Sequence, residues 1–363
     1  MFILMIRDTY FKNILRLVLI FAGFNHMGMN AYGQIHPADG DTVNYRMVGF
    51  KVPEKKNITG YILEVHEYLV RDDGTIHTKF LFEQQSDKNK IVATVPAFGK
   101  SYKWQVKYLQ KEKVTDSTGF NIFSVGSIAY TDTNKYRMRI VTNKLGGRDY
   151  FLFVDGTRTM YDMNGNALWY LPNIPGIVDD NTILRDIKVT PFNTITFLTS
   201  KNAFEIDYDG NVLWTAPNDG KISGDSSERY HHEFTRLKNG NYMVAGLKYI
   251  QKDIPENTPL PNNKTGIGKR NGKAYNEIPY ATLIEYDYMK KIVWVWLSEV
   301  HFTNADLFVL SPDANSFRSN THMNAFFFNE EEKTIYTSHR NINRIVKIAY
   351  PSGKVLANYG EDY

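Results

Sequence analysis

Short segments in which apolar and polar residues alternate fill the first third of the chain after residue 34. They are separated by clusters of Pro, Gly, Asp and Lys, which favour turns. In the strand predicted over residues 102–108, the large side chains all fall on one face, which we expect to be buried: Tyr102, Trp104, Val106 and Tyr108. This pattern is typical of a small antiparallel sandwich, and we predict a fibronectin-III-like β-sandwich domain over residues 34–125.

A hairpin motif recurs in the rest of the chain. Residues 161–169 (YDMNGNALW) are echoed by residues 206–214 (IDYDGNVLW), and their turn glycines, Gly165 and Gly210, are 45 positions apart. A hairpin cannot bury its own apolar face, so such units must stack on one another. A spacing of about 40 to 50 residues is typical of the four-stranded blades of a β-propeller.

Weaker copies of the hairpin follow at residues 285–294 and 348–356. We therefore predict an all-β chain in which residues 126–363 form a β-propeller domain, with about four blades' worth of sequence. Residues 251–273 are rich in Pro, Asn, Lys and Gly, and we predict a surface loop there.

The first 33 residues have the features of a secretory signal peptide. Lys12 and Arg16 precede a short apolar stretch at residues 17–24, and the small residues Ala31 and Gly33 suit a signal peptidase. The stretch is shorter than the about 20 residues that span a bilayer. We expect residues 1–33 to be removed and the mature protein to be periplasmic or secreted, without membrane contact. An uncleaved anchor or a start at a later Met is the alternative.

Charge and cysteine content exclude several classes of function. The formal net charge is +4, and residues 1–33 carry three basic and one acidic residue, so their removal leaves +2. A nearly neutral protein without a basic tract gives no reason to expect a nucleic-acid partner. The chain contains no cysteine, which rules out disulfides, thiolate metal sites and a cysteine nucleophile. The basic segment 265–273 is glycine-rich but lacks the spacing of a P-loop.

Two histidine clusters lie in the repeat region. His231 and His232 precede a predicted strand and an Asn-Gly turn, while His322 and Asn324 open another strand whose return carries Arg340. The first residues of the innermost strands of a propeller surround its central channel, so we expect these side chains to converge there. The alternative is structural: His322 and Arg340 cap a turn and pair with an acid from residues 330–332.

Both clusters resemble motifs of the bacterial arylsulfate sulfotransferases. Residues 231–246 (HHEFTRLKNGNYMVAG) are similar to the family's HHD and NGN strand pair, and residues 321–348 (THMNAFFFNEEEKTIYTSHRNINRIVKI) to its H-x-N, S-x-R and I-x-K-I blade. The resemblance covers most of residues 130–360 and implies a sandwich followed by a six-bladed propeller. Two positions depart from the pattern: Glu233 replaces the usual Asp, and His339 stands where a small residue is common.

The resemblance implies a transferase that moves a sulfuryl group from a phenolic sulfate ester to another phenol through a sulfohistidine, without a cofactor, a metal or PAPS. The implied catalytic residues are His232 with its neighbour His231, His322 and Arg340, and Asn324 would bind substrate. These residue types suit the chemistry. Donors around the sulfonate oxygens stabilise their charge, a neutral imidazole is a nucleophile, and a second histidine can exchange a proton with the phenols.

In the family the sulfated histidine lies in a later blade, and no residue of this chain corresponds to it. We therefore expect a C-terminally truncated chain with an incomplete and inactive propeller, or a different histidine in the nucleophile's place. Other interpretations are a non-catalytic propeller that binds a protein or glycan, and a hydrolase that gives the sulfuryl group to water.

A metal site built from His231, His232, Glu233 and His322 is disfavoured, because adjacent residues of a regular strand point to opposite faces. The sequence leaves open whether the protein forms a homodimer.

Overall fold

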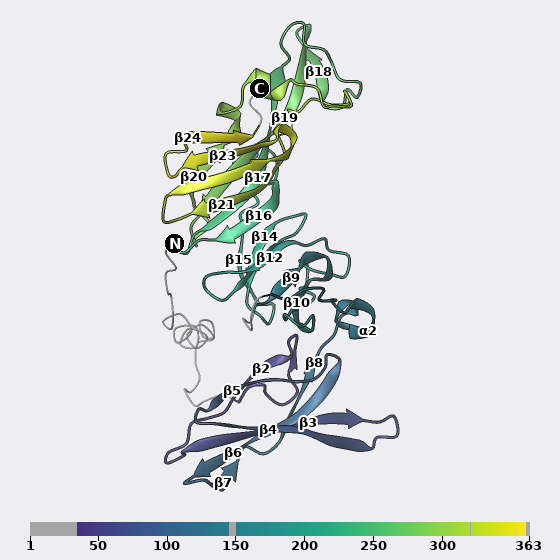
Figure 1. Ribbon diagram of the computed structural model, residues 1–363, viewed down its shortest axis with the longest axis vertical. Coiled ribbons are helices and arrows are strands. Elements are labelled where there is room, and N and C mark those ends of the chain that lie inside the picture. The colour runs from purple at the N-terminus through teal and green to yellow at the C-terminus, as the bar shows by residue number, and fades with distance from the viewer. Residues whose placement is uncertain (1–34, 145–149, 320, 361–363) are drawn as a thin grey trace. The chain divides into compact units, whose positions relative to one another are not determined.

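The computed structural model describes residues 35–144, 150–319 and 321–360, whose regular secondary structure is almost entirely β-strand (Figure 1). The predicted all-β class is therefore confirmed, whereas the predicted signal peptide lies outside the described residues. The α-helices in this part of the chain are single turns, α2 (Thr133–Tyr136) and α3 (Asn304–Leu307). No helix in the described ranges is long and apolar enough to cross a membrane.

The chain divides into two compact units, which we describe separately. One contains the residues up to Arg139 together with Asn166–Tyr170, and the other contains Ile140–Gly165 and Leu171–Tyr363. The short segment of the first unit is β11 (Ala167–Tyr170). It is held there by side chains of the same unit, since Arg46 Nη1 donates to Ala167 O at 3.0 Å and Asn44 Nδ2 donates to Tyr170 O at 2.7 Å.

The first unit is a sandwich of two sheets. The larger has the strand order β1-β8-β6-β3-β4 with β7 also paired to β6, and the smaller pairs β2 with β5. The bounds are β1 (Thr42–Val43), β2 (Met47–Lys51), β3 (Gly60–Val70), β4 (Ile76–Ser86), β5 (Lys90–Thr94), β6 (Lys100–Gln110), β7 (Lys113–Ser117) and β8 (Asn121–Val125).

The core of this unit lies between its two sheets. Phe50 of β2 meets Trp104 of β6 edge to face, with ring centroids 5.0 Å apart. The predicted buried face of β6 is confirmed, since none of its four large side chains is more than 1% exposed: Tyr102, Trp104, Val106 and Tyr108.

The second unit contains three successive sheets, each built on four antiparallel strands, after the pair β9 and β10. The first sheet is β12-β13-β14-β15, the next is β16-β17-β19-β20 with β18 added to β19, and the last is β21-β22-β23-β24. The bounds are β9 (Leu152–Val154), β10 (Thr159–Tyr161), β12 (Arg185–Val189), β13 (Ile195–Leu198), β14 (Ala203–Ile206), β15 (Val212–Thr215), β16 (Tyr230–Arg236), β17 (Tyr242–Asp253), β18 (Ile267–Arg270), β19 (Lys273–Tyr286), β20 (Ile292–Leu297), β21 (Met323–Asn329), β22 (Thr334–His339), β23 (Arg344–Ala349) and β24 (Val355–Gly360).

The last two strands of each of these sheets form the hairpins predicted from the repeat. Their turns use left-handed residues: Gly210 with φ of 89°, Lys290 with φ of 67° and Gly353 with φ of 71°. The three consecutive sheets are the units expected of propeller blades. Closure of such sheets into a ring remains a prediction.

Buried carboxylates tie successive sheets together at equivalent positions. Glu205 of β14 accepts from Tyr242 OH of the next sheet at 2.5 Å. Glu285 of β19 accepts from Tyr350 OH of the last sheet at 2.8 Å. Both carboxylates are fully buried, and each takes one of its donors from the neighbouring sheet. Trp214 stacks on the ring of Tyr242 with centroids 3.8 Å apart, which adds apolar contact at the first of these junctions.

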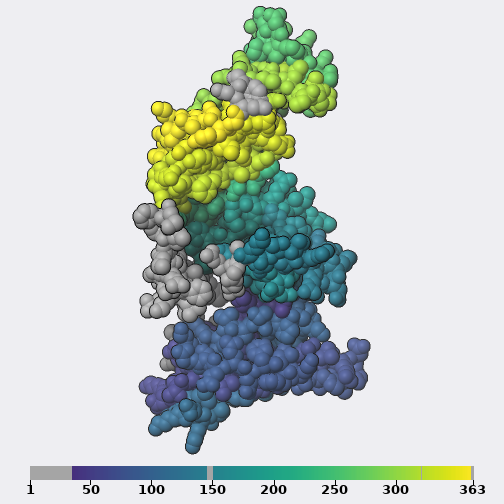
Figure 2. Space-filling view, viewed as in Figure 1, coloured from purple at the N-terminus to yellow at the C-terminus, as the bar shows by residue number. Residues whose placement is uncertain are grey.

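The surface loop predicted over residues 251–273 is wrong in part. Strands β17 and β19 stay paired from Tyr242 opposite Tyr286 as far as Asp253 opposite Tyr275, and β18 adds to the ribbon through a tight turn at Gly272. The ribbon projects from the rest of its unit (Figures 1 and 2). Composition suggested a loop because Pro, Asn and Gly are frequent there, but backbone pairing between the two long strands satisfies the hydrogen bonds that a loop would expose.

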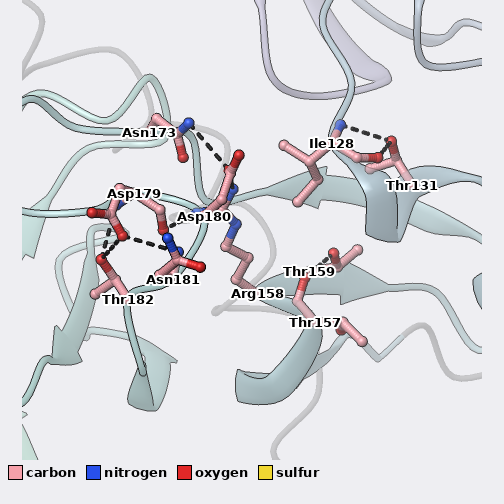
Figure 3. Close-up of polar contacts among 10 residues, drawn as sticks. All are labelled: Ile128, Thr131, Thr157, Arg158, Thr159, Asn173, Asp179, Asp180, Asn181 and Thr182. Carbon is pink, nitrogen blue, oxygen red and sulfur yellow. Dashed lines mark hydrogen bonds and ion pairs between the residues drawn. The ribbon is translucent and has the colours of Figure 1, made fainter.

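A buried arginine anchors the connection between β10 and β12. Arg158, only 5% exposed, donates to Asp179 O at 3.1 Å and to Asp180 Oδ1 at 3.0 Å (Figure 3). Asn173 donates to the same Asp180 oxygen at 3.3 Å, and Asp179 Oδ1 accepts from Thr182 Oγ1 at 2.7 Å. These bonds fix the chain just before it enters β12, the first of the strands that carry the site.

Candidate active site

Three neighbouring strands, β12, β16 and β21, carry the site, and each is irregular near its start. The register shifts between Arg185 and Lys188 in β12, between Tyr230 and Phe234 in β16, and between Met323 and Ala325 in β21. One left-handed residue lies in or directly before the start of each strand: Asp186 with φ of 57° in β12, His232 with φ of 60° in β16, and His322 with φ of 53° directly before β21. Such bulges redirect side chains, and their strained backbone is often found at functional sites.

The bulge in β16 brings the adjacent histidines together. His231 Nδ1 and His232 Nδ1 are 3.0 Å apart, and the two rings are nearly perpendicular with centroids 5.0 Å apart. The expectation that these side chains point to opposite faces is therefore wrong. It assumed a regular strand, and the left-handed backbone at His232 breaks the alternation.

Hydrogen bonding assigns the tautomers of this pair. His231 Nε2 lies 3.2 Å from Gly246 O, which can only accept, so Nε2 carries the proton. Burial and then the charge of His232 lower the pKa of His231 to about 4, so its Nδ1 is unprotonated at neutral pH. His232 Nδ1 must then donate to His231 Nδ1. Neutral His232 therefore has its lone pair on Nε2.

His322 and Arg340 join this pair from the third sheet. The rings of His232 and His322 are 5.2 Å apart between centroids and nearly perpendicular. Arg340 Nη2 lies 3.4 Å from His322 Nδ1, and Arg340 N donates to His322 O at 3.1 Å. A guanidinium can only donate, so Nδ1 of His322 accepts and its proton is on Nε2. Glu330 accepts from Lys238 N instead of pairing with Arg340, which removes the structural alternative for that acid.

Asn324 occupies the bulge of β21, between the pairs formed by Met323 with His339 and Ala325 with Ser338. Its side chain is half-buried. No hydrogen bond joins it to the three histidines within the described ranges. The structure thus brings His231, His232, His322 and Arg340 together. Asn324 lies in β21, two residues after His322.

The site is electropositive. Burial, followed by the charges of Arg185 and Arg340, lowers the pKa of His232. Burial, followed by the charges of Arg340 and His232, lowers the pKa of His322. The imidazoles are therefore neutral at neutral pH, and the guanidinium groups supply the positive charge. Such a set of donors and cations suits an anionic substrate.

Sequence reasoning missed Arg185. It has no motif around it, but it is the first residue of β12 and so occupies the position at which the histidines begin the neighbouring strands. Aligning the repeats at the first residue of each sheet would have placed Arg185 level with the histidines and so identified it.

A half-buried acidic residue supports the histidine bulge from the adjacent strand. Asp186 Oδ2 accepts from Phe234 N at 2.7 Å and from Lys188 Nζ at 2.9 Å, and Lys188 also pairs with Glu233. Burial raises the pKa of Asp186 to about 7, an effect that Lys188 opposes and Glu233 increases. Asp155 in turn accepts from the backbone N–H of Asp186 at 2.7 Å, so one carboxylate holds the bulge of β12 and another holds the bulge of β16.

His339, noted as a departure from the family motif, lies outside the site. It is 1% exposed, and its nitrogens bond to Thr337 Oγ1 at 3.0 Å and Thr321 Oγ1 at 3.3 Å. Burial lowers its pKa to about 3. Its role in this fold is to fill the space beside Phe302, whose ring lies 5.0 Å away between centroids.

The histidines and acids do not form a metal site in the part of the chain that the structure describes. No group of three or more His, Asp or Glu side chains there is placed to hold an ion.

Comparison with known proteins gives one family. The sequence pattern of the family described as Arylsulfotransferase (ASST) matches residues 140–362, a range that includes every residue of the site. No curated protein matches the chain.

Several solved structures have a weak likeness to this chain. One is a protein of unknown function from Bacteroides caccae, with 14% identity, a TM-score of 0.33, and coverage of 58% of this chain and 57% of that chain. Another is the dihydro-heme d1 dehydrogenase NirN in complex with DHE, with 10% identity, a TM-score of 0.29, and coverage of 98% and 55%. A putative 6-phosphogluconolactonase from Bacteroides fragilis has 10% identity, a TM-score of 0.26, and coverage of 85% and 97%. The chain spans just over half the length of the first two, and these TM-scores support no argument about function.

Proposed function

The chain belongs to the arylsulfotransferase family, and from that premise we propose that it transfers a sulfuryl group from a phenolic sulfate ester to a second phenol. The observation that carries the proposal is the tautomer of His232. Gly246 O fixes the proton of His231, His231 fixes the proton of His232, and a lone pair results on His232 Nε2. That atom is a nucleophile. Its ring lies next to that of His322, which in turn lies next to the guanidinium of Arg340.

In the first step the His232 Nε2 lone pair attacks the sulfur of the donor. The bond from sulfur to the phenolic oxygen breaks, an S–N bond forms, and the first phenol leaves as a phenolate that takes a proton from solvent. Charge on the three sulfonate oxygens is stabilised by Arg340 and by the Nε2–H of His322. Proton transfer from neutral His322 would leave an imidazolate, so we assign it hydrogen-bond donation.

In the second step the oxygen of the acceptor phenol attacks the same sulfur. The S–N bond breaks and its electron pair returns to His232 Nε2, while the proton of the acceptor passes to solvent. The sum is one sulfate ester and one phenol exchanged for another of each. We assign to Asn324, in the bulge of β21 two residues after His322, the orientation of the phenol or the sulfonate.

The test uses 4-nitrophenyl sulfate with and without an added phenol. We expect release of 4-nitrophenol that increases with the phenol, and a sulfated peptide that contains His232 when the acceptor is omitted. His232→Ala removes both. Arg340→Ala lowers kcat/KM by about 100- to 1000-fold, as expected for loss of a charge-stabilising donor.

His77→Ala is the matched control, because His77 is an exposed residue of β4 in the other unit. It is expected to match the unmodified protein. Sulfation of a different histidine would contradict the assignment to His232. Absence of both transfer and label at saturating ester would instead favour a non-catalytic protein that binds a protein or glycan partner.

A further inference from the structure

We call His231, His232 and His322 the histidine row. Arg185 lies at one end of this row and has no part in the proposed transfer step. It begins β12, and the residues that follow it tie this strand to the start of β16: Asp186 accepts from Phe234 N at 2.7 Å, and Lys188 pairs with Glu233. The first residue of β12 is thereby held next to the bulge that carries His231 and His232. Its side chain is exposed and so accessible to a substrate.

The two arginines act on different ends of the row. The charge of Arg185 affects His231 and His232, whereas that of Arg340 affects His232 and His322. Successive ring centroids in the row are 5.0 Å and 5.2 Å apart, so the row is longer than one sulfonate group. A sulfonate bound by Arg340 and His322 therefore leaves Arg185 available for another group.

Nearby acids are already engaged. Asp186 and Glu233 both pair with Lys188, and the carboxylate of Asp155 accepts from the backbone N–H groups of Asp186 and Ile187. Within the described residues no ion pair involves Arg185. A guanidinium without a carboxylate partner, in a site of neutral imidazoles, is suited to a bidentate bond with an oxyanion.

We propose that Arg185 binds a second anionic group on the phenol, so that the site prefers phenols with a carboxylate substituent. This inference rests on the proposed function. An aromatic ring separates a para substituent from the phenolic oxygen, as the imidazoles separate Arg185 from Arg340. Arg185 is thus a specificity-determining residue, distinct from the groups that bear on the transferring sulfonate.

The test compares 4-hydroxybenzoate with the neutral 4-hydroxybenzamide as acceptors, at a fixed concentration of 4-nitrophenyl sulfate. For Arg185→Ala we expect the ratio of kcat/KM for benzoate over benzamide to fall about 10- to 100-fold, mainly through KM, as for loss of a charge-assisted hydrogen bond. Arg185→Lys keeps the charge but not the bidentate geometry. Its ratio of kcat/KM for the two acceptors is expected to lie between those of the unmodified protein and Arg185→Ala.

Arg270→Ala is the matched control, since Arg270 is an exposed arginine that pairs with Asp253 on the projecting ribbon. It is expected to leave the ratio unchanged. An unchanged ratio in Arg185→Ala, or equal losses on both acceptors, overturns the inference.

A binding measurement separates failure of this inference from failure of the proposed function. Calorimetric titration with 4-hydroxybenzoate and 4-hydroxybenzamide requires no turnover. If the protein transfers no sulfuryl group but binds the benzoate more tightly, and Arg185→Ala abolishes the difference, the inference stands without the proposed reaction. Equal affinities for the two compounds contradict it.

Discussion

The Nδ1 atoms of His231 and His232 lie 3.0 Å apart, although the two residues are neighbours in a strand. A left-handed residue at a bulge makes this contact possible, since φ at His232 is 60°. Because His231 Nε2 donates to the main-chain oxygen of Gly246, the proton shared by the pair belongs to His232. The backbone of β17 therefore sets the state of a side chain in β16.

His231→Ala is expected to impair catalysis without removing a reacting group. His232 loses the acceptor for its Nδ1–H, so its tautomer and its ring orientation are no longer fixed. We expect kcat to fall about 10- to 100-fold, comparable to loss of a base-orienting partner.

His231→Asn provides the comparison for this prediction. Its amide oxygen can replace the lost acceptor, so part of the activity should return. Equal losses of kcat in the two variants would show that an acceptor at position 231 does not orient His232.

Asp186→Asn is expected to change how stability depends on pH. In the folded protein burial raises the pKa of Asp186 to about 7 from 3.8, with Lys188 and Glu233 as the facing charges. The folded state then holds this proton more tightly than the unfolded chain, so the contribution to stability is present at low pH and lost as pH rises towards 7. Asn does not titrate. Relative to wild type, the variant should gain about 4 kcal/mol in free energy of unfolding between pH 4 and pH 8.

Urea unfolding at pH 4, 6 and 8 measures this difference. Asp72→Asn, at an exposed turn of the other unit, serves as the control and should stay parallel to wild type. A stability difference for Asp186→Asn that does not change with pH would contradict the prediction.

Tyr242→Phe and Tyr350→Phe test the carboxylate ties between sheets. Each removes one donor to a buried carboxylate, Glu205 or Glu285, at a cost of about 1–3 kcal/mol in free energy of unfolding. The larger loss is expected for Tyr242, which is fully buried, whereas Tyr350 is half-buried.

Denaturant unfolding of the single and double variants checks the two values. The sites share no partner, so the losses should add. Tyr288→Phe removes the same hydroxyl group from an exposed tyrosine and should leave the free energy of unfolding unchanged. A loss as large for Tyr288→Phe would show that the buried ties are not the cause.

Local pattern was sufficient for much of the fold. Alternation in 102–108 predicted a face that is buried, and repeated Asn-Gly or Asp-Gly turns predicted hairpins that the structure contains. The ribbon at residues 251–273 was missed because pairing between β17 and β19 is a long-range property that composition does not report.

The sequence by itself determined the all-β class, the hairpin repeat and the identity of the residues that meet at the site. His231, His232, His322 and Arg340 were all found from two motifs. Only the tertiary structure decided how they meet. Register shifts and left-handed residues depend on partner strands. The carbonyl of Gly246 in β17 selects the tautomer of His231, which in turn sets that of His232. The start of β12, which carries Arg185, lies next to β16 because the two sheets pack together, and no local motif encodes that packing.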